Sequence, residues 1–175
     1  MFFGLTNSPA TFQTMMNEIF QDLISEGVVC IYLDDILIFT ETMEEHDRVT
    51  HLVLDWLRQY KLYLRHDKCK FAKTKIEYLG LIISHGQVEM DPVKITGVAE
   101  WPTPSNKEVQ SFLGFTNFYR CFIQGFSDLT RPMFDLTQKD SAWRWGEVEK
   151  AAFEAIRACM ISAPILVFPD ETRPF

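Results

Sequence analysis

Two adjacent carboxylates lie between two short apolar runs and form the part of the sequence best suited to chemistry. Asp34 and Asp35 follow the run 28–32 and precede the run 36–39, both rich in β-branched and aromatic residues. Such runs predict a β-hairpin with the carboxylates at or beside its turn. Carboxylate oxygens are ligands that Mg²⁺ prefers, and paired ions can promote phosphoryl transfer. The pair alone is equally compatible with a structural turn, because Asp is common in turns.

The first half of the chain also predicts elements that would position this hairpin. Ser8–Pro9 is typical of a helix start, with Ser8 at the N-cap, and apolar residues recur at helical spacing as far as Gly27. The capping box at 42–45 begins a second helix. The runs 76–84 and 87–90, on either side of His85–Gly86, predict a second hairpin.

The second half is mainly helical in pattern. A final apolar run at 165–168 looks like a strand with no partner after it. We therefore expect an α+β fold, with helices and antiparallel hairpins first and an all-helical bundle after them. The predicted helices of the bundle begin at Asp91–Pro92 and at the capping box 105–108, and continue over 129–136 and 147–160.

Composition places the chain among globular proteins. Its 175 residues are 47% apolar and 23% charged, which excludes a disordered chain, a collagen-like chain and a disulfide scaffold. No apolar run approaches the ~18–20 residues that span a bilayer. No signal peptide is recognisable, and the four cysteines are irregularly spaced. An intracellular protein, cytoplasmic or nuclear, with reduced thiols is therefore expected.

The charge is unevenly distributed. The formal net charge of −7 argues against a protein that coats nucleic acid by bulk charge. Between Arg58 and Lys75, however, seven cationic side chains stand against one carboxylate, Asp67. This basic segment is either a solvated face or a contact surface for phosphates.

Several segments, in order along the whole chain, resemble the reverse transcriptase of gypsy-type LTR retrotransposons. Tyr32–Phe39 resembles the catalytic Tyr-x-Asp-Asp hairpin, and 3–13 resembles the segment that precedes it in the palm. The segment 78–84 is similar to the hairpin that grips the primer. The remaining similarities, to the intervening helix, the following basic strand, the thumb and the stretch before the RNase H domain, lie at 44–46, 68–71, 101–104, 112–123 and 163–170.

The resemblance implies roles for particular residues. Asp34 and Asp35 would be the catalytic, metal-binding carboxylates, with Mg²⁺ or Mn²⁺ as cofactor. Phe3, Gly4 and Tyr32 would lie at the pocket for the incoming nucleotide. Template and primer contacts are implied for Gln13, Tyr78, Leu79, Gly80, Lys68, Lys70, Asn117 and Arg120.

The resemblance also implies a partial polymerase palm followed by a thumb. Residues 1–90 would be the C-terminal part of the palm, 91–162 the thumb, and 163–175 the start of a connection toward an RNase H domain. Family members carry a third catalytic aspartate and triphosphate-binding fingers upstream of the matching segment. The chain is therefore expected to be truncated at both ends and to have little or no polymerase activity by itself. In the full enzyme the partners would be an RNA or DNA template–primer and dNTPs.

Two alternatives stay open at this stage. The chain could be a domesticated retrotransposon remnant that binds protein or nucleic acid without catalysis. It could also associate with itself, or with a second chain that completes the enzyme, through exposed edges of the palm sheet.

Overall fold

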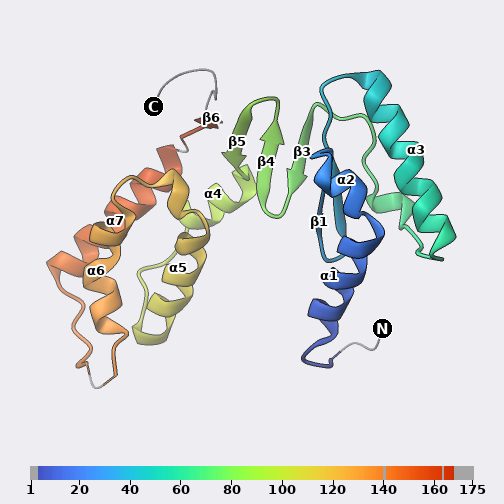
Figure 1. Cartoon of the computed structure of the whole chain (residues 1–175). Helices are drawn as coiled ribbons and strands as arrows, with labels where there is room; N and C mark the ends of the chain where they lie inside the picture. The colour runs from blue at the N-terminus through green and yellow to red at the C-terminus, as the bar shows by residue number, and fades with distance from the viewer. Residues whose placement is uncertain (1–3, 140, 163, 168–175) are drawn as a thin grey trace. The chain divides into compact units, whose positions relative to one another are not determined.

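A computed structural model describes residues 4–139, 141–162 and 164–167, and leaves out the side chains at 106 and 107. The chain forms two compact units, Met1–Thr74 and Lys75–Phe175. Both contain helices and antiparallel strands, coloured in chain order from blue to red in Figure 1. The predicted α+β class is therefore confirmed. In the described part of the chain, no helix is both long and apolar enough to cross a membrane.

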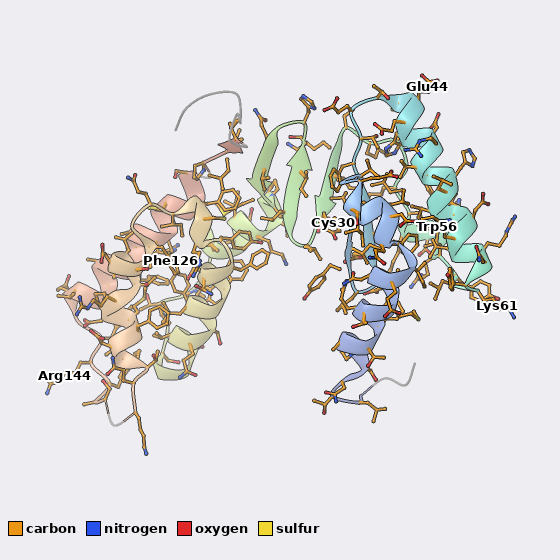
Figure 2. The ribbon with its side chains drawn as sticks, viewed as in Figure 1. Cys30, Glu44, Trp56, Lys61, Phe126 and Arg144 are labelled. Carbon is orange, nitrogen blue, oxygen red and sulfur yellow. The ribbon has the colours of Figure 1, made fainter. Side chains whose placement is uncertain are left out.

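The first unit packs its helices and a two-stranded antiparallel sheet into one core. Phe20 and Val49 are fully buried there. Trp56, labelled in Figure 2, lies on α3, and its ring is 5.7 Å from that of Phe20, centroid to centroid. The elements are α1 (Ser8–Ile19), α2 (Gln21–Ser25), β1 (Val29–Tyr32), β2 (Asp35–Ile38), α3 (Met43–Gln59) and the short 3₁₀ helix η1 (His66–Lys68).

The start of this unit differs from the sequence prediction in two details. The predicted single helix is interrupted at Phe20, whose φ of −106° and ψ of 16° separate α1 from α2. Regular apolar spacing predicts the burial of Phe20, which is confirmed, but does not predict the change of backbone conformation there. The N-cap of α1 is Asn7 rather than Ser8. The predicted start of α3 is confirmed, because Thr42 Oγ1 accepts a hydrogen bond from the Glu45 N–H at 3.2 Å.

The second unit packs a four-stranded antiparallel sheet, in the order β3–β4–β5–β6, against a helical bundle. Leu81, Val88 and Leu166 of the sheet contact the core of the bundle, which contains the buried rings of Phe112 and Phe153. The elements are β3 (Lys75–Tyr78), β4 (Leu81–Ser84), β5 (Gln87–Met90), α4 (Pro92–Ala99), α5 (Asn106–Phe118), η2 (Arg120–Phe122), α6 (Phe126–Leu136), α7 (Glu147–Ser162) and β6 (Leu166–Val167).

Two predicted helix starts in the bundle are confirmed. The Asp91 carboxylate accepts a hydrogen bond from the Val93 N–H at 2.9 Å at the start of α4. At the start of α5, Ser105 and Glu108 form the expected capping box, in which Glu108 accepts from the Ser105 N–H at 2.7 Å. Local side-chain chemistry therefore predicts these helix ends well.

The hairpin predicted about His85–Gly86 is confirmed, because Ser84 of β4 pairs with Gln87 of β5. The rest of the sheet was predicted less well. The run 76–84 is broken at Leu79–Gly80, so β3 and β4 form a hairpin of their own. The terminal strand predicted at 165–168 is present as β6 over its described part, with position 168 outside the described residues, and its partner precedes it in the sequence, because Leu166 pairs with Val88 of β5. The sheet thus shares a core with the helices, and this contact places it in the second compact unit. A functional boundary at residue 90 stays a prediction.

Candidate active site

The β1–β2 hairpin places Asp34 in its turn and Asp35 at the start of β2. Tyr32 pairs with Asp35, so Leu33 and Asp34 form a two-residue loop. Leu33 has a positive φ of 52°, whereas the φ of Asp34 is not positive. A positive φ at the first loop position alone is the geometry of a type II′ turn, whose twist matches a hairpin. A leucine in a sparsely populated positive-φ conformation costs of order 1–3 kcal/mol, so its surroundings must hold it.

The side chain that holds this turn comes from α1. Gln13 Oε1 accepts a hydrogen bond from the Leu33 N–H at 2.6 Å, and Gln13 Nε2 donates to the Ile31 carbonyl oxygen at 3.1 Å. Gln13 Nε2 also donates to Asn17 Oδ1 at 2.8 Å. The half-buried carboxamide thereby joins α1 to the strand that precedes the carboxylates. Sequence reasoning missed this contact. The template contact expected for Gln13 stays a prediction.

The two carboxylates are accessible to a ligand. Asp34 and Asp35 are both exposed, and the side chain of Tyr32 beside them is 54% exposed. Within the described ranges, no cluster of three His, Cys, Asp or Glu side chains could hold a metal ion, so the donor set here is this pair. Such a set fits Mg²⁺, which is usually held by one or two carboxylates and completes its shell with waters and substrate phosphates.

The remaining residues of the predicted nucleotide pocket are only partly described. Phe3 lies outside the described residues. Gly4 is exposed, with a φ of 91°, and an added Cβ would meet no atom within 4 Å. The glycine is therefore required by its backbone conformation rather than by lack of space. The nucleotide-pocket role of Phe3, Gly4 and Tyr32 stays a prediction.

A second candidate contact surface is the β3–β4 turn in the second unit. Tyr78 pairs with Leu81, and the two loop residues Leu79 and Gly80 both have positive φ, 50° and 78°. This is the type I′ geometry of a tight hairpin. The Tyr119 hydroxyl, at the end of α5, donates to the Gly80 carbonyl oxygen at 3.0 Å. The turn predicted to contact the primer is thus fixed to the helical bundle.

Tyr119 holds the β3–β4 turn through this bond, and it is not among the site residues predicted from the sequence. It is 2% exposed, and a Cβ added at Gly80 would lie 3.4 Å from its hydroxyl oxygen. A tyrosine within an apolar run is the one available signal, because a buried hydroxyl needs a hydrogen-bond partner. The predicted contact residues Asn117 and Arg120 lie on either side of it and are exposed. Their nucleic-acid contacts stay predictions.

The Tyr119→Phe variant is expected to lose less stability than the wild type at alkaline pH. Burial raises the pKa of the Tyr119 hydroxyl, with smaller contributions from the charges of Asp91 and Glu77. The unfolded chain releases this proton near pH 10, about the ordinary pKa of tyrosine, whereas the folded chain keeps it to higher pH. In the wild type, titration of Tyr119 therefore leaves the free energy of unfolding unchanged below that pH. The free energy of unfolding falls as the pH rises from there through the raised pKa of the folded chain.

Urea unfolding of both proteins over a pH series from about 8 to 11 measures this difference. Tyr63→Phe is the matched control, because Tyr63 is 92% exposed. At neutral pH Tyr119→Phe is expected to cost about 1 kcal/mol for the lost hydrogen bond. Parallel stability curves for wild type and Tyr119→Phe up to the highest pH would contradict this account.

The basic segment is largely free of compensating ion pairs. Arg65 pairs with Asp67 at 2.6 Å and Lys75 with Glu89 at 2.8 Å. Over the residues that the structure describes, no carboxylate lies within 4 Å of the other five cations, which are all exposed: Arg58, Lys61, Lys68, Lys70 and Lys73. Lys61 lies just beyond the C-terminal end of α3 (Figure 2). These side chains remain available for phosphate contacts.

Comparison with known families matches residues 1–83 to the family described as reverse transcriptase (RNA-dependent DNA polymerase). The chain is 37% identical, over 175 residues, to the retrovirus-related Pol polyprotein from transposon 297 of Drosophila melanogaster. This alignment covers 99% of the chain and 16% of that polyprotein. The chain is also 35% identical, over 165 residues, to the transposon Tf2-3 polyprotein of Schizosaccharomyces pombe. That alignment covers 94% of the chain and 12% of that polyprotein. The chain thus spans about one sixth of the length of the first of these relatives.

Solved structures show the same fold. The foamy viral protease-reverse transcriptase in complex with dsDNA superposes with a TM-score of 0.83 and 25% identity, over 99% of this chain and 37% of that one. The same viral protein in complex with an RNA/DNA hybrid gives a TM-score of 0.78 at 24% identity, over 93% of this chain and 22% of that one. The arrangement of helices and hairpins is therefore that of a reverse transcriptase.

Proposed function

Since this chain is a reverse transcriptase fragment related to retrotransposon polyproteins, we propose that it supplies acidic active-site residues of a gypsy-type RNA-directed DNA polymerase. The observation that carries the proposal is the exposed Asp34–Asp35 pair, at a hairpin turn that a side chain of α1 holds in place. The hairpin presents two hard oxygen ligands to solvent, as a metal site for phosphoryl transfer requires.

The chemistry divides between the carboxylates and the contact surfaces. Mg²⁺ or Mn²⁺ held by Asp34 and Asp35 would supply positive charge to activate a 3′-hydroxyl and stabilise the leaving pyrophosphate. Tyr32 would lie beside the primer end, since it flanks the turn and is exposed. The Leu79–Gly80 turn would contact the primer strand, and the uncompensated cations would contact phosphates.

The alternative of a remnant that serves only as a binding module is not favoured. Similarity to a transposon polyprotein extends over 99% of the chain, and both carboxylates of the catalytic pair are present. The proposal includes pairing of the outer edge of β2, which no described strand covers, with another strand from the same polyprotein or a second copy, because an edge strand offers its peptide groups for pairing.

Binding of a labelled RNA–DNA hybrid, followed by fluorescence anisotropy over a salt series with and without Mg²⁺, tests the proposal. We expect binding to weaken as salt rises, with a slope of about −0.9 in log K against log salt per phosphate contacted. Replacing both Lys68 and Lys70 by glutamine is expected to reduce the magnitude of that slope by about 2. Mg²⁺ is expected to strengthen binding when the Asp34–Asp35 pair is present.

The matched control is Lys150→Gln, which removes one exposed cation from α7. It is expected to leave the slope nearly unchanged. No detectable binding of the hybrid at low salt would contradict the proposed function, since it would mean that the net charge of −7 outweighs the local cations.

A further inference from the structure

We propose that Gln13 is a positioning residue that holds the Leu33–Asp34 turn and thereby fixes the placement of both carboxylates. The inference rests on the proposed metal-binding role of Asp34 and Asp35. Gln13 does not itself carry a charge that could bind the metal, so it acts through the backbone of the hairpin.

The contact uses every polar atom of the Gln13 side chain. Its oxygen accepts from the Leu33 N–H at 2.6 Å, and its nitrogen donates to the Ile31 carbonyl at 3.1 Å and to Asn17 Oδ1 at 2.8 Å. The Asn17 contact lies one turn further along α1 and orients the carboxamide on its helix. A side chain engaged at all its polar atoms is well determined in position.

The carboxamide of Gln13 takes the place of a neighbouring strand. Because Tyr32 and Asp35 close the hairpin, the peptide groups of Tyr32 face β2. The Ile31 carbonyl and the Leu33 N–H therefore face the opposite, outer edge of β1. A peptide group on an adjacent strand would offer one donor and one acceptor to these two groups. The Gln13 carboxamide offers the same pair.

This contact explains how the turn keeps a leucine at positive φ. The hydrogen bond from the Leu33 N–H to Gln13 fixes the peptide plane between Tyr32 and Leu33, which is one of the two planes that define φ at Leu33. Without that bond the backbone can relax toward negative φ, where leucine is favoured. Asp34 and Asp35 follow directly, so a change of φ at Leu33 would redirect both carboxylates. Strain of this kind is expected where a functional site over-determines the backbone.

The residue type is specific to this role. Asparagine is one methylene shorter than glutamine. A glutamate carboxylate would retain an acceptor for Leu33 but would place a second acceptor against the Ile31 carbonyl. Only a neutral carboxamide of this length satisfies both backbone groups without adding charge near the aspartates. Both protons of Gln13 Nε2 are engaged, so a template contact by the same carboxamide would have to use the second lone pair of Oε1.

Nuclear magnetic resonance on the ¹⁵N-labelled 175-residue chain tests the inference with two readouts. The first is the hydrogen-exchange protection of the Leu33 amide, which reports the contact with Gln13. The second is the Mn²⁺ concentration that broadens the amide signals of Asp34 and Asp35, which reports metal binding. The variants are Gln13→Met, Gln13→Glu and the control Gln59→Met, which alters an exposed glutamine at the end of α3.

We expect Gln13→Met to lower Leu33 protection by about tenfold and to weaken Mn²⁺ binding by about threefold to tenfold, the order expected for losing neutral hydrogen bonds. Gln59→Met should change neither readout. In Gln13→Glu, the protection of the Leu33 amide should be low at neutral pH. It should return toward the wild-type value measured at the same pH when the introduced carboxyl group becomes protonated at low pH. A protonated carboxyl has an acceptor and a donor in the places of the carboxamide, and a merely space-filling role would not produce this pH profile.

Three results would overturn the inference. The Leu33 amide could be unprotected in the wild type, or Gln13→Met could leave its protection unchanged. Alternatively, Gln13→Met could remove the protection while Mn²⁺ binding stays at the wild-type value, which would make the contact structural only. Failure of the proposed function looks different, because the wild type itself would then show no Mn²⁺ broadening at Asp34 and Asp35.

Discussion

Replacing Asp34 or Asp35 by asparagine is expected to lower nucleotide incorporation by about 10³-fold in a reverse transcriptase that contains this segment. Asparagine has nearly the shape of aspartate but lacks its negative charge, so the pair can no longer balance a divalent ion. Losing several kcal/mol of transition-state stabilisation corresponds to a change of this order. Single-turnover extension of a primer on an RNA template with Mg²⁺ measures it.

The hairpin itself should survive these substitutions. The turn is held through backbone groups of Ile31 and Leu33, and both aspartates are exposed. Leu33 amide protection should therefore match the wild type, which separates loss of chemistry from loss of structure. Asp47→Asn, at an exposed position of α3, is the matched control and should keep full activity. An Asp34→Asn or Asp35→Asn enzyme within about tenfold of the wild-type rate would argue against metal-ion catalysis at this pair.

Replacing Phe153 by alanine is expected to destabilise the second unit by about 3–5 kcal/mol, the usual cost of removing a buried aromatic ring. Phe153 is 1% exposed, and its ring lies 4.6 Å from that of Phe112 and 6.0 Å from that of Trp145, measured between centroids. The Arg157 guanidinium lies 5.3 Å from the same centroid. The loss is a large share of the roughly 5–15 kcal/mol that stabilises a small domain.

Urea unfolding followed by tryptophan fluorescence measures this effect, since Trp145 contacts Phe153 directly. Phe134→Ala is the matched control, because Phe134 lies on α6 and is 44% exposed. It is expected to cost less than about 1 kcal/mol. A Phe153→Ala protein with a nearly unchanged unfolding midpoint would mean that the bundle can close over the missing ring.

Arg157 adds a second link to this core and shows why the bundle depends on α7. Its guanidinium donates to the carbonyl oxygens of Val98 and Ala99 at the end of α4, and pairs with Glu154 at 3.0 Å. The last carbonyls of a helix have no partner within the helix, so a cation from a neighbouring helix satisfies them. Nothing in the local sequence around Arg157 indicates this partner, because it lies 58 and 59 residues away.

The sequence by itself determined much of the local structure and predicted where chemistry would occur. The apolar runs on either side of Asp34 and Asp35 predict the strands of a hairpin, and the resemblance to the Tyr-x-Asp-Asp hairpin predicts that its two carboxylates bind metal. The helix starts at Asp91 and Ser105 follow from side-chain groups within three residues of the backbone they cap. These features are readable because the interacting groups are close in sequence, so each leaves a short pattern.

Only the tertiary structure decided how the two hairpin turns are held. Gln13 reaches the β1–β2 turn across 20 residues, and Tyr119 reaches the β3–β4 turn across 39 residues. Both bonds join a side chain to a backbone group, and any residue type supplies that backbone group. The pairing of β6 with β5 joins residues that are still further apart in sequence, since Leu166 pairs with Val88. Such contacts leave no spacing pattern, since they depend on how packed cores bring remote segments together rather than on local propensity.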